Sequence, residues 1–465
     1  MRRRHDCTLR GNAPDSRGRG ITDGGAALQL KHKKMSTPVR GVEEESVLEL
    51  VAPELVGMSP TRLKRIGDWM QRYVDERRLP GVSVLVNRRG SNAYFDMVGL
   101  RDIESAKPLE EDTIFRIYSM TKPITSVAVM MLYEQGCFQL DDPLEKFLPE
   151  FSDMQVLIGG DAEAPELEPA RSPITIRHLL THTSGLTYDF MQATPVDALY
   201  RKHKITFDNR RSTLAELTAR AARMPLLFHP GSAWSYGIST DVLGRLVEVL
   251  SGQPLDQFFE EHILQPLGMV DTAFSVSEDK VERLAVMYGP PGGRGLGDVN
   301  AAGQRPEPGL DVLDRAAGGR FARPPGVLSG GGGLTSTVAD YLRFCQMLVN
   351  KGKLDGVRLL GRKTVEYMTC NHLPGDMADM GQAVFSEASM AGVGFGLGFS
   401  VVLDPAKSQT IGSVGEYAWG GAASTGFWID PQEELIVILM TQLMPSSTYP
   451  LRRELHSLVY QALVD

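Results

Sequence analysis

A central helix starts within the stretch Phe115-Arg-Ile-Tyr-Ser119-Met-Thr-Lys122-Pro123, and Pro123 fixes where it begins. Proline is tolerated only in the first turn of an α-helix. The helix must therefore begin within a few residues of Ser119, and the apolar periodicity that follows predicts that it spans 123–135. Ser119 is expected at the helix N-terminus, where unpaired N–H groups and the helix dipole favour negative charge on an attacking oxygen.

Ser119 and Lys122 form an S-x-x-K pair. Residues at i and i+3 share a helix face, so the Lys122 amine can reach Ser119 Oγ. A lysine with its ordinary pKa of about 10.4 is charged at neutral pH, but burial lowers that pKa and makes the amine a base. The pair predicts Ser119 as nucleophile and Lys122 as its base, although an N-cap serine with a surface lysine fits the pattern equally well.

A second S-x-x-K, Ser277-Glu-Asp-Lys280, occurs in a charged segment with no apolar helix after it. We interpret it as a solvated surface turn. Because S-x-x-K occurs twice in this chain, the pattern alone does not identify a catalytic pair, and further motifs are needed to support Ser119 and Lys122.

Two later segments supply candidate partners for Ser119. Tyr236 ends the turn-rich stretch Pro230-Gly-Ser-Ala-Trp-Ser-Tyr236 before a helix, and a tyrosine on such a loop can relay a proton; a packing role is the alternative. Trp419-Gly420-Gly421-Ala422 precedes a strand, and its glycines let backbone approach a substrate closely. An N–H of this stretch, with that of Ser119, is predicted to form an oxyanion hole, the alternative being a β-bulge or turn.

Other catalytic chemistries find little support. The chain contains no G-x-S-x-G, so the nucleophile elbow of α/β-hydrolases is absent. His178 and His182 stand at i, i+4 without a third ligand, which favours capping or packing. The cysteines form no C-x-x-C pair and have no histidine at metal-ligand spacing, so no metal site is expected.

Local patterns outline the fold. Ser59 is the predicted N-cap of a helix with an apolar stripe from Leu63 to Tyr73, and alternating runs through 82–98 predict a β-hairpin. Helices are predicted at 213–223, 239–251 and 254–262 and from Arg452, and strand-like runs at 395–403, 424–429 and 435–440. Strands at both ends around a helical middle predict an α/β fold: a mostly antiparallel sheet flanked by helices, with an inserted helical lobe.

The expected domain organisation follows from the same patterns. Residues 1–45 are expected to be a disordered extension, because they are polar and rich in basic residues. Residues 46–465 are expected to form one domain, with an α/β part at about 46–118 and 330–465 and a helical lobe at about 119–288. The connecting loop, 289–329, belongs to a stretch, 289–333, with 20 Gly or Pro in 45 positions, a composition that supports neither helix nor strand.

Bulk properties exclude several classes of partner. A net charge of −8 on 465 residues provides no field that would attract nucleic acid. No run approaches the roughly 18 to 20 apolar residues of a membrane helix, and the basic N-terminus lacks the apolar run of a secretory signal. The expected location is cytoplasmic, without membrane partners, and the sequence leaves the oligomeric state open.

Together, Ser119-Met-Thr-Lys122, the Tyr236 loop and Trp419-Gly-Gly resemble the penicillin-recognising serine hydrolases, the superfamily of class C β-lactamases and penicillin-binding proteins. Within it, the chain most resembles the family VIII carboxylesterases. The resemblance covers roughly 55–465 and includes Leu179-Leu-Thr-His-Thr-Ser-Gly-Leu186 and Ser329-Gly-Gly-Gly-Gly-Leu334. It implies an acyl-enzyme mechanism without cofactor, in which Ser119 attacks, Lys122 and Tyr236 manage the proton, an alcohol leaves and water hydrolyses the ester.

Departures from the family pattern indicate the substrate. Class C β-lactamases have Tyr-Ala-Asn where this chain has Tyr236-Gly237-Ile238, and Lys-Thr-Gly where it has Trp419-Gly420-Gly421. In the family, that Asn and Lys help to hold a β-lactam, and a missing polar partner costs discrimination. Small-molecule esters with short to medium acyl chains are therefore expected, with weak lactam hydrolysis as a side activity. A β-lactamase or D-amino-acid peptidase, an acyltransferase and a non-catalytic scaffold remain as alternatives.

Overall fold

The computed structural model describes residues 48–206, 211–293, 295–298, 307–381, 384–385 and 388–465. The predicted extension, 1–45, lies outside the described residues, as do positions 294 and 299–306 of the Gly/Pro-rich loop. Among the residues described, no helix combines the length and the apolar character that crossing a bilayer requires.

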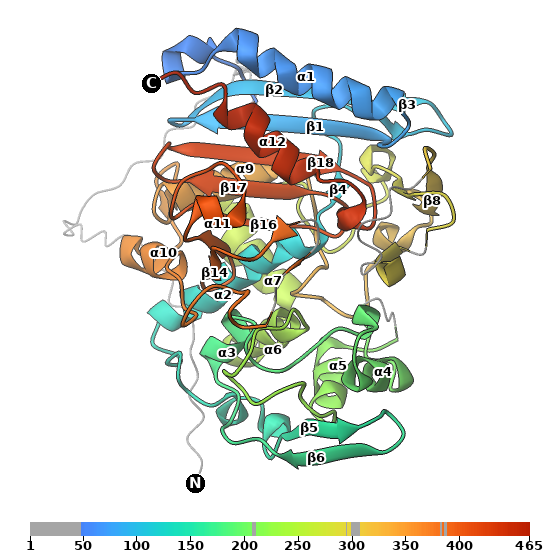
Figure 1. Ribbon diagram of the computed structural model, residues 1–465, viewed down its shortest axis with the longest axis vertical. Coiled ribbons are helices and arrows are strands. Elements are labelled where there is room, and N and C mark those ends of the chain that lie inside the picture. The colour runs from blue at the N-terminus through green and yellow to red at the C-terminus, as the bar shows by residue number, and fades with distance from the viewer. Residues whose placement is uncertain (1–47, 207–210, 294, 299–306, 382–383, 386–387) are drawn as a thin grey trace, which may run out of the picture.

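An eight-stranded antiparallel sheet forms the centre of the molecule and unites segments from both ends of the chain (Figure 1). The two ends meet where β1 pairs with β18, in a register that places Leu85 opposite Ile438. This confirms the predicted mostly antiparallel sheet. In spatial order the strands are β14 (Val393–Phe395), β15 (Ser400–Val402), β16 (Tyr417–Gly420), β17 (Gly426–Asp430), β18 (Leu435–Thr441), β1 (Gly81–Arg88), β2 (Ser91–Asp102) and β3 (Lys107–Pro108).

Helices cover both faces of this sheet, because its strands bury apolar side chains on both sides. On β18, Leu435, Val437 and Leu439 belong to the core cluster of α1 (Pro60–Asp75) and α12 (Leu451–Tyr460). The alternate residues of β18 face the larger core, against which α9 (Val338–Val349) packs. The predicted N-cap of α1 is confirmed, since Ser59 Oγ accepts the N–H of Arg62.

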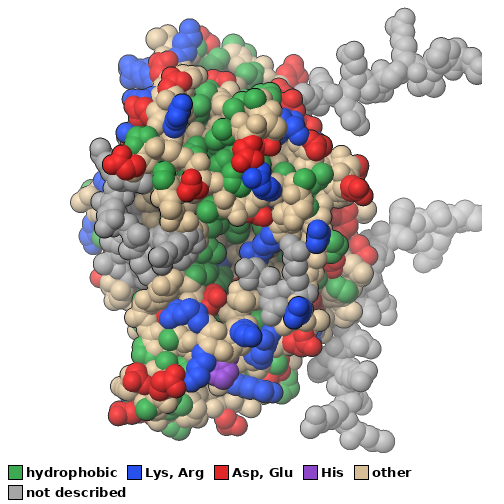
Figure 2. Space-filling model, turned by 90° about the vertical axis from the view of Figure 1, so that its right-hand side faces the viewer, with side chains coloured by type: hydrophobic (Ala, Val, Ile, Leu, Met, Phe, Trp, Pro, Cys, Tyr) green, Lys and Arg blue, Asp and Glu red, His purple; other side chains and the backbone are tan. Residues whose placement is uncertain are grey.

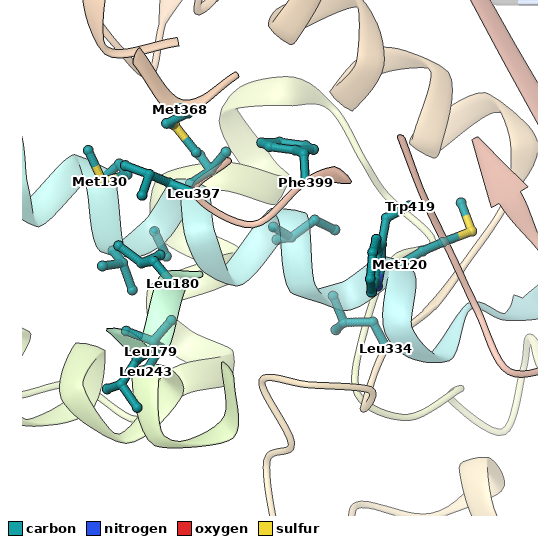
Figure 3. Close-up of a cluster of buried hydrophobic side chains, with 14 of the residues drawn as sticks. Met120, Met130, Leu179, Leu180, Leu243, Leu334, Met368, Leu397, Phe399 and Trp419 are labelled. Carbon is teal, nitrogen blue, oxygen red and sulfur yellow. The ribbon is translucent and has the colours of Figure 1, made fainter. Parts of the chain in front are cut away.

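The helix α2 (Thr121–Glu134) runs between the sheet and the helical lobe, and eleven of its 14 residues are buried. A helix that is apolar on all sides must lie within a core. Figure 3 shows this core around α2, with residues of the C-terminal half on one side and of the lobe on the other, namely Met368, Leu397 and Phe399 against Leu179, Leu180 and Leu243.

After α2, the helical lobe contains six α-helices and one small hairpin among the described residues. The predicted helix at 239–251 is confirmed with the same bounds. The elements are α3 (Ile176–Leu180), α4 (Pro195–Lys202), α5 (Leu214–Ala221), α6 (Ser239–Ser251), α7 (Leu255–Phe259), α8 (Gln265–Leu267), β5 (Gln155–Gly160) and β6 (Pro165–Pro169).

Short elements complete the described chain. The remaining strands pair in twos, as β4 (Phe115–Arg116) with β9 (Thr335–Ser336), β7 (Met287–Gly289) with β8 (Asp311–Asp314), β10 (Lys353–Leu354) with β11 (Val357–Arg358), and β12 (Val384–Phe385) with β13 (Ala388–Ser389). The remaining α-helices are α10 (Arg362–Met368) and α11 (Pro405–Ser408).

Two predictions differ from the structure. The run at 395–403 is divided into β14 and β15, because the chain turns between them and Gly398 adopts φ 99°, which favours glycine. The Gly/Pro-rich segment was expected to lack strands, but Asp311–Asp314 forms β8. That strand lies in a short part of the segment free of Gly and Pro, and it pairs with β7.

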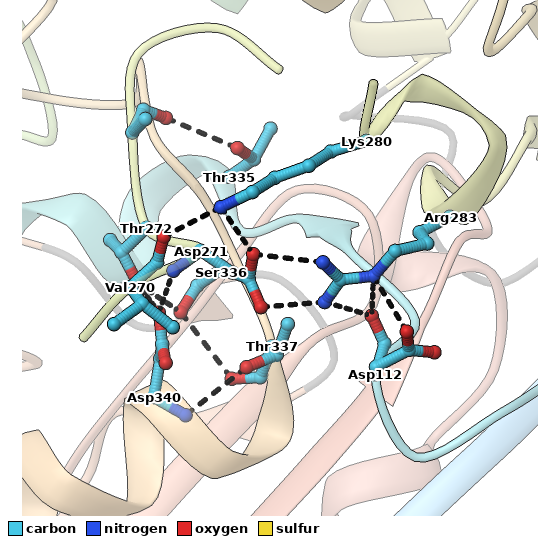
Figure 4. A network of polar contacts seen from close by, with 11 residues as sticks. Asp112, Val270, Asp271, Thr272, Lys280, Arg283, Thr335, Ser336, Thr337 and Asp340 are labelled. Carbon is cyan, nitrogen blue, oxygen red and sulfur yellow. Dashed lines mark hydrogen bonds and ion pairs between the residues drawn. The ribbon is translucent and has the colours of Figure 1, made fainter. Parts of the chain in front are cut away.

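Hydrogen bonds connect the loop at 270–273 to β9 and to the start of α9 (Figure 4). Asp340, in the first turn of α9, accepts the N–H of Asp271 at 2.7 Å and the hydroxyl of Thr272 at 2.8 Å. Burial raises the pKa of Asp340 to about 6. Because β9 pairs with β4, which leads directly to Ser119, the network helps to position that segment.

We predict that Asp340→Ala lowers the free energy of unfolding by about 1 to 3 kcal/mol, because buried donors lose their acceptor. Urea denaturation would measure the change. The matched control is Asp75→Ala, which removes an exposed acceptor of Gln71 and should cost about 0 to 0.5 kcal/mol. Equal losses in both variants would contradict the proposed role of Asp340.

Candidate active site

Ser119 lies in a short 3-10 helix, Tyr118–Met120, that continues directly into α2. Pro123 occupies the third position of α2, so the predicted helix start is confirmed. Tyr118 has φ 42°, a left-handed conformation that bulky residues rarely adopt. Strained backbone of this kind persists where its surroundings hold it in place, and it gathers at functional sites.

Lys122 is buried, with 2% of its surface exposed, and its amine lies 3.3 Å from Ser119 Oγ. The same Nζ donates to the carbonyl of Gly331 at 2.6 Å and to the hydroxyl of Tyr188 at 3.0 Å. Burial lowers the pKa of Lys122 to about 7, while the nearby charge of Asp241 acts in the opposite direction. The amine is therefore available as a base near neutral pH.

Asp241 is a second buried ionisable group of the site and lies in the first turn of α6. Its carboxylate accepts the hydroxyl of Ser329 at 2.5 Å, the N–H of Gly331 at 3.0 Å and the hydroxyl of Tyr188 at 3.3 Å. Burial raises the pKa of Asp241, whereas the Lys122 charge and these donors favour its ionised form. The carboxylate thus connects the groups that surround the lysine.

Tyr236 donates its hydroxyl proton to Ser119 Oγ at 2.5 Å. Its ring is enclosed by aromatic neighbours, with ring centres 5.2 Å away for His182, 5.4 Å for Tyr188 and 5.7 Å for Trp419. Burial raises the pKa of Tyr236, so the hydroxyl keeps its proton at neutral pH. Sequence reasoning left open whether this residue only packs, and the structure places its hydroxyl on Ser119.

The segment Trp419–Ala422 lies at the end of β16. The pairing of β15 with β16 ends at Ala418, whereas β17 continues opposite β16 as far as Gly420. A Cβ on Gly421 would lie 2.3 Å from the carbonyl oxygen of Ile117, so only glycine lets this backbone approach the Ser119 segment so closely. Across the described residues, the N–H groups of Ser119 and Ala422 form no hydrogen bond.

Ser119, Tyr236 and the segment Trp419–Ala422 line one cleft of about 260 Å³. On the face shown in Figure 2, a hollow lies between the part of the molecule that contains the sheet, above, and the helical lobe, below. Lys and Arg side chains are grouped on the surface of the lobe. Further apolar lining of the cleft comes from Phe190, Met191, Leu296, Met390 and Val393.

The two histidines weighed as ligands have structural roles. His178 Nδ1 accepts the N–H of Thr175 in a capping box at the start of α3. His182 is buried against the rings of Trp234 and Tyr236. The part of the chain that the structure describes contains no group of three or more His, Cys, Asp or Glu placed to hold a metal ion.

The second S-x-x-K pair has no role near Ser119. Ser277 is exposed in a turn, and Lys280 binds the carbonyl of Val270 and the carboxylate of Asp271 (Figure 4). This arrangement is that of a surface turn, as predicted.

Sequence reasoning did not identify Tyr188 and Asp241. Asp241 falls in the first turn of a correctly predicted helix, where acidic residues are common because of the helix dipole, so nothing local marks it as buried. Tyr188 follows the quoted segment Leu179–Leu186 by two residues. A polar residue next to a family motif was the signal that could have indicated it.

The chain is similar in sequence and in structure to known serine hydrolases and acyltransferases. The beta-lactamase family model matches residues 66–461. Esterase EstB of Burkholderia gladioli is 35% identical over 382 residues, which cover 79% of this chain and 86% of EstB. The structure of EstCE1, described as a hydrolase with promiscuous acyltransferase activity, gives a TM-score of 0.69 at 29% identity and covers 86% of this chain and 99% of EstCE1.

The unliganded structure of simvastatin synthase LovD from Aspergillus terreus has a TM-score of 0.71 at 26% identity, with coverage of 87% of this chain and 98% of LovD. Sequence and fold relationships therefore extend over most of the chain rather than over a single motif. Its antiparallel sheet and its S-x-x-K helix are consistent with these relationships, and the chain therefore belongs to the beta-lactamase family of serine hydrolases.

Proposed function

We propose that this chain, with residues 46–465 as its catalytic domain, is a serine hydrolase that cleaves carboxylic esters through an acyl-enzyme on Ser119. One observation carries the proposal. Lys122 and Tyr236, from two separate elements, both contact Ser119 Oγ, at 3.3 Å and 2.5 Å. A nucleophile within hydrogen-bond reach of a base and a proton donor is the arrangement that covalent catalysis requires.

Acylation begins with the neutral form of Lys122. A neutral amine has two N–H groups and one lone pair. The two N–H groups donate hydrogen bonds to the Gly331 carbonyl and to the Tyr188 hydroxyl. The lone pair can then accept the Ser119 hydroxyl proton while Oγ bonds to the ester carbonyl carbon. The oxyanion that forms would be stabilised by the N–H groups of Ser119 and Ala422.

Breakdown of this intermediate needs a proton for the departing alcohol. Tyr236 retains its proton because its hydroxyl is buried, so it can protonate the alkoxide oxygen as the C–O bond breaks. Lys122 and Tyr236 both contact Ser119 Oγ, so the proton that Lys122 took from Ser119 can pass there to the tyrosinate and restore the hydroxyl. Water then adds to the acyl carbon and gives a proton to the neutral Lys122 amine. That proton returns to Ser119 Oγ as its bond to the acyl carbon breaks and the carboxylic acid leaves.

The apolar residues at positions 238 and 419 favour an uncharged ester. Trp419 packs against Tyr236 and Phe395, with ring centres 5.7 Å and 5.3 Å away, and Ile238 is fully buried. Positions 238 and 419 thus offer neither an amide nor an ammonium group to a lactam. Supporting this, the relative EstB is named an esterase.

Acyl transfer to a second alcohol is a further candidate function. The apolar cleft lining, which includes Phe190 and Leu296, could hold an alcohol in place of water. EstCE1 is a hydrolase with promiscuous acyltransferase activity, and a 29% identical relative from Aspergillus terreus is a monacolin J acid methylbutanoyltransferase.

Substitution of the S-x-x-K pair is the first test. Ser119→Ala should abolish hydrolysis of p-nitrophenyl butyrate, and Lys122→Met should lower kcat/KM by about 10² to 10⁴, the contribution of a general base. The second S-x-x-K provides a matched control, because Ser277 is exposed and Ser277→Ala should retain activity. Near-full activity of Lys122→Met at neutral pH would show that the base is another group.

The pH profile tests the environment of Lys122. Since only the neutral amine accepts a proton, kcat/KM should rise with pH through a midpoint near the lysine pKa of about 7. The Asp241 charge raises that pKa, so Asp241→Asn should move the midpoint to lower pH. Asp355→Asn, at an exposed position, should leave it unchanged. An unchanged or higher midpoint in Asp241→Asn would contradict the assignment.

Substrate preference separates the remaining alternatives. We expect a far higher kcat/KM for p-nitrophenyl butyrate than for nitrocefin, because positions 238 and 419 lack polar partners for a lactam. A higher value for nitrocefin would identify a β-lactamase instead. A new ester that replaces the free acid when a primary alcohol is added would identify an acyltransferase, and failure of a fluorophosphonate to label Ser119 would indicate a scaffold.

A further inference from the structure

Arg452, in the first turn of α12, lies over a floor made by two glycines. Gly420 of β16 and Gly426 of β17 are opposite each other in the sheet. A Cβ on Gly420 would lie 2.5 Å from Nη2 of Arg452, and a Cβ on Gly426 would lie 2.9 Å from its Nε. The absence of side chains at both positions therefore lets the guanidinium lie close to the strands.

The guanidinium binds the two carbonyls at the ends of the turn between β16 and β17. Nη2 donates to the carbonyl oxygen of Gly421 at 3.0 Å and to that of Thr425 at 2.7 Å, and Nε donates to the latter at 3.2 Å. The turn is also closed by a hydrogen bond from the Gly421 N–H to the Thr425 carbonyl at 2.9 Å. Arg452 thus fixes the orientation of the peptide that follows Gly421.

The orientation of that peptide determines where the Ala422 N–H points. In a trans peptide, the C=O of one residue and the N–H of the next point in opposite directions. Because the Gly421 carbonyl points to Arg452, the Ala422 N–H points away from Arg452. Ala422 and Ser119 line the same cleft, and within the described residues this N–H has no acceptor.

We propose that Arg452 is a positioning residue, which aims the Ala422 N–H at the oxyanion by holding the Gly421 carbonyl from the opposite side. This inference rests on the proposed function, because it assumes an acyl-transfer oxyanion at Ser119. A planar guanidinium suits the role, since it donates to two carbonyls in a fixed geometry, whereas a lysine amine acts as a point charge.

The backbone of α12 is held independently of the Arg452 side chain. His456 lies 3.0 Å from the carboxylate of Glu416, and Tyr460 donates to the same carboxylate at 2.5 Å. Trp69 of α1 donates to Glu454 at 2.6 Å. Substitution of the Arg452 side chain therefore leaves the helix with its other attachments.

The first test compares Arg452→Met with Arg358→Met. Arg358 also donates to two carbonyls, those of Lys351 at 3.1 Å and Leu360 at 3.0 Å, but it is exposed and does not line the cleft. Loss of an oxyanion donor costs about 10² to 10³ in kcat, so a misdirected donor should lower kcat for p-nitrophenyl butyrate by about 10- to 100-fold. KM should change little, and the midpoint of the pH profile should stay at the wild-type value, because Lys122 is untouched. Arg358→Met should match the wild type.

A second variant keeps the inference testable if Arg452→Met fails to fold. In Gly420→Ala the new Cβ displaces the guanidinium, which is the far end of a flexible side chain, and kcat should fall in the same way. The two changes act through one group, so the double variant should lose no more than Arg452→Met alone. Wild-type kcat in a folded Arg452→Met variant, a loss confined to KM, or additive losses in the double variant would each overturn the inference.

The rate of Ser119 labelling by a fluorophosphonate separates this inference from the proposed function. The phosphoryl oxygen of the probe occupies the oxyanion position, so labelling should be slower in Arg452→Met than in Arg358→Met. Wild-type protein that is labelled but cleaves no ester would overturn the ester proposal alone, and the labelling rates would still decide the role of Arg452. Equal labelling rates in the two variants would overturn the inference.

Discussion

The burial of the Lys122 amine is the constraint on which the site depends. An amine removed from water needs acceptors for its N–H bonds, and its charged form becomes less favourable. The acceptors are Tyr188 and the Gly331 carbonyl, from segments 66 and 209 residues away. Gly331 can approach the lysine only because it has no side chain: a Cβ at this position would lie 2.5 Å from the Asp241 carboxylate. The lysine therefore brings three separate segments together at the start of α2.

The sheet contributes the opposite wall of the site through the way its strands end. β15 pairs with β16 only as far as Ala418, so the last residues of β16 lie at the cleft. Their two faces have different functions. Trp419 packs against Tyr236, whereas Gly420 faces Arg452 of α12. An apolar wall and a backbone donor thus come from consecutive residues of one strand.

Much of the fold followed from local patterns. The cap at Ser59, the hairpin at 82–98 and the bounds of α6 depend on neighbours in sequence, and capping and periodicity express those contacts directly. The division of 395–403 into two strands was missed, because its apolar residues suit either one strand or two and the turn depends on Gly398. Asp241 was missed because burial of a carboxylate depends on residues far away in the chain.

By itself, the sequence determined that Ser119 and Lys122 share the first turns of one helix, because Pro123 restricts the helix start and i, i+3 spacing fixes which side chains meet. Only the tertiary structure decided what that pair can do. The pKa of Lys122 depends on burial and on Asp241, and the contact of Tyr236 with Ser119 joins residues 117 apart. Such properties depend on distances between remote segments, which periodicity and spacing do not specify.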